Sequence, residues 1–105
     1  MKQACVFVQK DQVNIINQTA LAADALELEY SIQFELLEVL NELLEKTKPT
    51  DYSGSRPPKR SYEDEISGLD LFAFVVEINR FEETVYYKFS ISQDAFWLVS
   101  LHIDR

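Results

Sequence analysis

The sequence has very few of the residues on which several common functional sites depend. Among 105 residues there are two glycines, one cysteine and one histidine. A P-loop or a Rossmann turn needs several glycines close together, so neither is expected here. One cysteine and one histidine cannot make a Cys/His zinc site within one chain. We therefore expect no metal and no cofactor, and we interpret Cys5 as a buried thiol of a reducing compartment.

Long apolar runs and an excess of positive charge are also missing. No run approaches the ~18 apolar residues of a membrane-spanning helix, and the N-terminal apolar stretch is too short for a secretory signal. The 18 acidic residues outnumber the 10 basic ones, which gives a net charge of -8. This charge disfavours an anionic membrane surface and a general nucleic-acid binder, because a phosphate backbone must be met by cations. The sequence predicts a cytoplasmic protein without membrane contact.

What the chain does have is material for one hydrophobic core. Its residues are 47% hydrophobic and 12% aromatic, and its length suits a single domain over residues 1–105. Residues 4–8 are interpreted as a short strand, and Asp11–Ala25 as a helix with Leu21 and Ala25 facing inward.

The clearest helix follows Ser31, which is suited to cap it. Apolar residues recur there at spacings of three and four: Ile32, Leu36, Leu37, Leu40, Leu43 and Leu44. The opposite face carries Glu35, Glu38, Glu42 and Glu45. This acidic row is either a solvated helix face or a docking surface for a basic protein partner.

The last third of the chain is rich in β-branched and aromatic residues, which predicts strands over Leu69–Ile78, Thr84–Ile91 and Ala95–Ile103. Short connections make them an antiparallel three-stranded meander. In the second strand, alternation places Tyr86 and Lys88 on one face and Val85, Tyr87 and Phe89 on the other. In the third, it groups His102 with Ser100, Leu98 and Phe96. The fold class is therefore α+β: a short N-terminal strand, two helices, then the meander with helices packed on one face.

Residues 47–68 form a predicted loop that contains all three prolines and both glycines. This region also differs in charge from the rest of the chain. Residues 46–62 carry five cations against one acid, whereas the segments before and after are each strongly acidic. The cations are Lys46, Lys48, Arg56, Lys59 and Arg60. One basic loop in an acidic chain keeps a local nucleic-acid site possible.

Four segments together resemble a known family. They are Lys48-Pro49-Thr50-Asp51-Tyr52-Ser53-Gly54, Leu69-Asp70-Leu71-Phe72-Ala73-Phe74, Val85-Tyr86-Tyr87-Lys88-Phe89 and Leu98-Val99-Ser100-Leu101-His102. Their order is similar to the C-terminal pattern of MqsR-like toxins, in the RelE-like group of bacterial toxin–antitoxin ribonucleases. The resemblance spans about residues 35–103 and includes the family's Tyr-x-Lys and its final Ser-x-His.

The resemblance implies a RelE-like fold and a metal-independent endoribonuclease (an mRNA interferase) that is neutralised by a cognate antitoxin. On the matching positions, Lys88 would stabilise the transition-state charge and Tyr86 would transfer a proton or stack a base. His102 would act as acid or base, since imidazole exchanges protons near neutral pH. Arg56, Lys59 and Arg60 would bind the RNA backbone.

The composition favours an interpretation of a different class, whereas the order of the motifs favours the ribonuclease. Small acidic proteins inhibit nucleases by presenting carboxylates to a basic nucleic-acid site. The chain would then be a non-enzymatic inhibitor or immunity-type protein, and the row Glu35, Glu38, Glu42 and Glu45 would be its surface. Neither interpretation predicts the oligomeric state.

Overall fold

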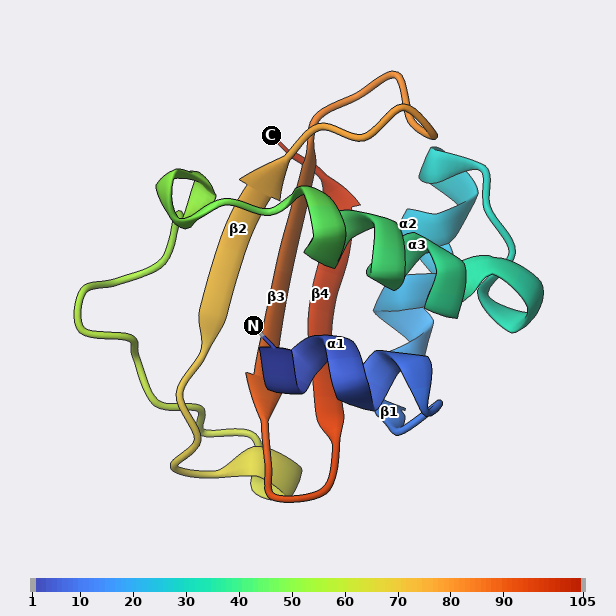
Figure 1. The fold of residues 1–105 in the computed structure, drawn as a ribbon. Coiled ribbons are helices and arrows are strands. Elements are labelled where there is room, and N and C mark those ends of the chain that lie inside the picture. The colour runs from blue at the N-terminus through green and yellow to red at the C-terminus, as the bar shows by residue number, and fades with distance from the viewer. Residues whose placement is uncertain (1, 105) are drawn as a thin grey trace.

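The computed structural model describes residues 2–104 and has an α+β fold, as the sequence predicts (Figure 1). Within those residues the chain forms three α-helices and a four-stranded sheet. The helices are α1 (Lys2–Gln9), α2 (Gln18–Leu28) and α3 (Ile32–Lys46). The strands are β1 (Val13–Ile15), β2 (Phe72–Val76), β3 (Val85–Ile91) and β4 (Phe96–Ile103). None of the helices in this part of the chain combines the length and apolar character needed to cross a bilayer.

The sheet has the order β1-β4-β3-β2, so β2 and β1 are its edge strands. Strands β2, β3 and β4 form the expected antiparallel meander, and β1 adds a parallel neighbour to β4. Figure 1 shows α1 and α3 crossing in front of the sheet, with α2 alongside β4. One hydrophobic cluster joins buried residues of these helices to β2, β3 and β4.

Helix α3 confirms the helix that the apolar spacing after Ser31 predicts. The Ser31 hydroxyl accepts a hydrogen bond from the Phe34 amide, while the Ser31 amide donates to the Glu35 carboxylate at 2.9 Å. This reciprocal pair satisfies two polar groups at the start of the helix. Leu40 and Leu43 are fully buried, so the apolar stripe faces the sheet as its spacing predicts.

Of the two N-terminal predictions, the first is wrong and the second is right only from Gln18 onward, where Leu21 and Ala25 are buried as expected. Residues 4–8 lie in α1 rather than in a strand, because Ala4, Phe7 and Val8 are buried at spacings of three and four. The predicted helix over Asp11–Ala25 is instead strand β1 followed by α2. Asn17 separates them: its side-chain oxygen accepts a hydrogen bond from the Ala20 amide and caps α2.

Strand β4 departs from simple alternation at Val99. Phe89 pairs with Leu98, yet Lys88 pairs with Ser100, so Val99 is an extra residue in a β-bulge. The bulge reverses which residues face inward, because side chains alternate along a strand. The predicted grouping of His102 with Leu98 is therefore wrong: Leu98 is buried in the core, whereas His102 is half-buried and pairs with Tyr86.

The 47–68 loop passes along the outer edge of β2. The Ser53 amide donates to the Ala73 carbonyl, and the Leu71 amide donates to the Lys59 carbonyl, both at 2.8 Å. These bonds occupy part of an edge that would otherwise expose unpaired backbone groups. The residues between them are held against β2 at both ends, which fixes where the loop's cations lie.

A partly buried hydrogen bond joins the end of α3 to the sheet. The Thr47 hydroxyl lies 2.6 Å from both the Leu43 carbonyl and the Tyr87 hydroxyl. Since the carbonyl can only accept, Thr47 donates to it and Tyr87 donates to Thr47. Burial raises the pKa of the Tyr87 phenol to about 12. The folded protein therefore keeps this proton at pH values where the unfolded chain loses it.

Replacing Tyr87 with Phe should flatten the alkaline dependence of stability. Because the folded pKa lies above the ordinary value of 10, the stabilisation is complete below about pH 10 and is lost as pH rises to about 12. A proton that only the folded state keeps lowers the free energy of unfolding by about 1.4 kcal/mol for each pH unit in that window. Urea unfolding at several alkaline pH values measures this slope. Tyr62→Phe is the control, since Tyr62 is 97% exposed. An equally steep slope in both variants would contradict the assignment.

Candidate functional site

A small hollow on the face of the sheet that carries Tyr86 brings together two lysines from distant parts of the chain. Lys88 projects from β3, and Lys59 comes from the loop along β2. We call this the lysine hollow; its volume is about 330 Å³, and its lining includes Tyr86, Ser53 and Ser55. Lys88 is half-buried and Lys59 is exposed. Two ammonium groups beside hydroxyl donors suit an anionic group such as a phosphate.

His102 joins this site through Tyr86. The two residues are cross-strand partners on β4 and β3, and their rings stack at 5.0 Å between centroids. The His102 Nδ1 atom lies 2.8 Å from the Ile103 carbonyl oxygen. A carbonyl only accepts hydrogen bonds, so this contact holds a proton on Nδ1 and leaves the lone pair of the neutral ring on Nε2.

Burial raises the pKa of the Tyr86 phenol. A protonated phenol can donate a hydrogen bond or a proton. One face of its ring is covered by His102. The three residues predicted to be catalytic, Tyr86, Lys88 and His102, thus lie on one face of the sheet, on adjacent strands.

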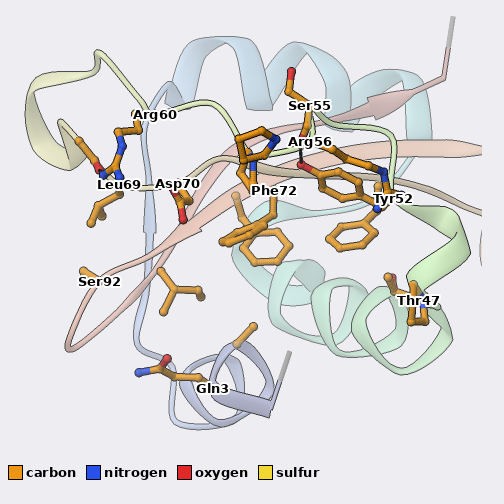
Figure 2. Close-up of a pocket in the computed structure, with 18 of the residues that line it drawn as sticks. Gln3, Thr47, Tyr52, Ser55, Arg56, Arg60, Leu69, Asp70, Phe72 and Ser92 are labelled. Atoms are coloured by element: carbon orange, nitrogen blue, oxygen red, sulfur yellow. Dashed lines mark hydrogen bonds between the residues drawn. The ribbon is translucent and has the colours of Figure 1, made fainter.

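The other two predicted RNA-binding residues lie elsewhere. Arg56 and Arg60 line a larger hollow of about 1140 Å³ on the opposite face of β2, which we call the aromatic groove. Its floor includes the rings of Tyr52, Phe72, Phe74 and Phe89. Figure 2 shows Arg60, Leu69 and Asp70 at one end of the groove and Thr47 at the other, with Gln3 of α1 facing them. The loop's cations are therefore divided between the two faces of β2.

The acidic row of α3 has a partner within the chain. Arg80, in the connection between β2 and β3, reaches Glu35 and Glu38 at 2.7 Å and bonds to Glu42 through both Nε and Nη2. The hydrogen bond to Glu42 raises the pKa of the Arg80 guanidinium. Glu45 is exposed near the end of α3. Three of the four carboxylates proposed for a basic partner are already paired with one arginine.

Two features of the site have no recognisable pattern in the sequence. Ser53 and Ser55 enter the lysine hollow because their segment lies against β2, and the aromatic groove forms from residues spread between Gln3 and Gln93. The pattern Phe72-x-Phe74 on an edge strand does indicate an apolar face that needs cover. Within residues 2–104, no three His, Cys, Asp or Glu side chains are grouped to hold a metal ion.

Arg80→Ala should destabilise the fold, because it leaves three neighbouring carboxylates without their shared cation. The groups are partly solvated, so we expect a loss of about 1–2 kcal/mol in urea unfolding at neutral pH. Lys46→Ala, an exposed cation on the same helix, is the control. If both variants lose the same stability, the cluster has no structural role.

No family model matches the chain, and no curated protein matches it. The resemblance to MqsR-like toxins therefore rests on the four segments named above, and the chemistry of the site has to be argued from its geometry.

Proposed function

We propose that this protein is a metal-independent endoribonuclease of the toxin–antitoxin type, with its reaction centre at the lysine hollow. The observation that carries the proposal is that three side chains line one hollow and a fourth stacks on one of them. Lys88 and Tyr86 project from β3, Lys59 reaches the same hollow from the loop, and His102 of β4 stacks on Tyr86. Cleavage of RNA by its own 2′-hydroxyl uses a general base, a general acid and cations, and an imidazole, a phenol and two ammonium groups can fill these roles.

The reaction is an internal displacement at phosphorus. The 2′-hydroxyl proton passes to Nε2 of His102, the bond between O2′ and phosphorus forms, and the bond between phosphorus and O5′ breaks. Tyr86 gives its proton to O5′, which is far more basic than a phenolate. The products are a 2′,3′-cyclic phosphate and a free 5′-hydroxyl. Lys88 and Lys59 neutralise the charge that gathers on the phosphoryl oxygens.

The net charge of -8 opposes RNA binding at long range, so the cations have to act locally. Arg80 places one positive charge among three carboxylates of α3, so this cluster stays acidic and is already counted in the net charge. The same pairing weakens the inhibitor hypothesis, because those carboxylates would first have to leave Arg80.

Lys88→Ala should lower the rate of cleavage of a single-stranded RNA by about 100-fold, because it removes a cation from the developing phosphorane. The rate is measured on a labelled oligonucleotide in the presence of a chelator, and mass spectrometry of the products should show the cyclic phosphate. Induced expression of the wild type in bacteria should arrest growth, and Lys88→Ala should relieve the arrest.

Lys10→Ala is the matched control, since Lys10 is an exposed lysine just after α1 and outside the hollow. It should cleave RNA at the wild-type rate. Intact RNA and normal growth with the wild type would refute the proposal, as would equal activity in the Lys88 and Lys10 variants.

Replacing Tyr86 with Phe tests whether Tyr86 donates the proton to the leaving oxygen. It keeps the ring that stacks on His102 and removes only the hydroxyl, so the fold should remain intact. We expect a fall of about 100-fold with the natural 5′-oxygen leaving group. With a substrate whose 5′-oxygen is replaced by sulfur, a much better leaving group, the defect should nearly vanish. A defect of the same size on both substrates would mean that Tyr86 is not the acid.

A further inference from the structure

The aromatic groove lies where the helical layer ends. None of the helices in the described part of the chain crosses in front of β2 (Figure 1). The inward face of this edge strand is therefore covered only in part, and Phe72 stays half-buried beside Leu69 and Ile91. An apolar face of this size is a common site for a partner.

The rim of the groove has the charge opposite to that of the chain as a whole. Lys48, Arg56 and Arg60 line it, against Asp70 alone among acidic residues. All three cations are exposed, although the protein carries a net charge of -8. An occupant with carboxylates around an apolar centre complements this surface.

The rings of the floor already contact other groups. Phe74 stacks on Tyr87 and on Phe89, and Phe89 stacks on Phe96 at 4.7 Å between centroids. The Arg56 guanidinium lies 4.8 Å from the centre of the Tyr52 ring. Phe72, Leu69 and Ile91 add further apolar surface, and such a floor suits apolar side chains.

The size of the groove suits a chain segment. Its volume of about 1140 Å³ lies at the upper end of the range for ligand pockets and is enough for several side chains. The space runs from Thr47 near the end of α3 to Arg60 and Asp70 (Figure 2). Several consecutive side chains of a peptide fill such a space, with acidic residues at its edges.

We propose that the aromatic groove binds an acidic peptide segment of a partner protein, whose apolar side chains pack on Phe72 and Leu69 and whose carboxylates pair with Arg56, Arg60 and Lys48. This site is separate from the lysine hollow and does not depend on RNA cleavage. Ser55 lines both hollows, so a bound segment contacts the same stretch of loop that carries Lys59.

The experiment titrates the isotope-labelled full chain with a synthetic peptide of about fourteen residues, in which leucine or phenylalanine recurs among glutamates at helical spacing. Amide signals of Leu69, Asp70 and Phe72 should shift, while those of Lys88 and His102 stay in place. The same peptide with glutamine for every glutamate should bind at least about tenfold more weakly, because the rim then has no charge to pair with.

Arg56→Glu and Lys59→Glu are a matched pair. Both reverse an exposed cation of one loop, but Arg56 lines the groove and Lys59 lines the hollow on the other face of β2. Arg56→Glu should weaken peptide binding by about tenfold, and Lys59→Glu by less than about twofold. Unchanged thermal unfolding in both variants shows that the fold is kept.

Several results would overturn the proposal. The acidic peptide could leave the groove signals unshifted, or the two substitutions could weaken binding equally. An RNA oligonucleotide could shift the groove signals instead, or sedimentation could show a dimer that Arg56→Glu dissociates. Peptide binding by a protein that cleaves no RNA would refute only the proposed ribonuclease. RNA cleavage without peptide binding would refute only this inference.

Discussion

The single extra residue in β4 is the constraint on which both the core and the candidate site depend. Side chains alternate between the two faces of a sheet, so an insertion of one residue moves every following side chain to the other face. Before Val99, Phe96 and Leu98 point into the core; after it, Leu101 does, and His102 turns to the face that carries Tyr86. With a regular strand, His102 would be directed toward the helices, and the fold would bury an imidazole in an apolar cluster at considerable cost.

The parts of the fold that the sequence predicts correctly are those with a long periodic pattern. Helix α3 has fifteen residues with a repeated apolar spacing and a capping serine, and the meander comes from β-rich runs that follow one another in the sequence. The failures are short elements. Strand β1 has three residues, and its partner, β4, lies at the other end of the chain. A pattern of three residues does not distinguish a strand from a helical turn, and a pairing between distant segments leaves no local signal.

The sequence predicts the candidate site only in part, as it does the fold. Alternation in β3 correctly placed Tyr86 and Lys88 on one face, because β3 itself has no extra residue. It assigned His102 to the wrong face, since no residue type marks a β-bulge reliably. The division of Lys59 from Arg56 and Arg60 was beyond sequence reasoning, because it depends on hydrogen bonds between the loop and the edge of β2. The pairing of Arg80 with α3 was missed for the same reason: it joins residues far apart in the chain.

The two proposed sites both carry cations, but they differ in the groups that surround those cations. A uniformly basic surface would attract RNA and acidic peptides to the same place, whereas here the loop distributes its cations on opposite faces of one edge strand. Lys59 lies beside polar groups and another lysine, which favours a phosphate; Arg56 lies beside aromatic rings, which favours carboxylates attached to apolar side chains. Arg56 and Lys59 are only three residues apart, and Ser55 lines both hollows. The loop is therefore the element that the two proposed sites share.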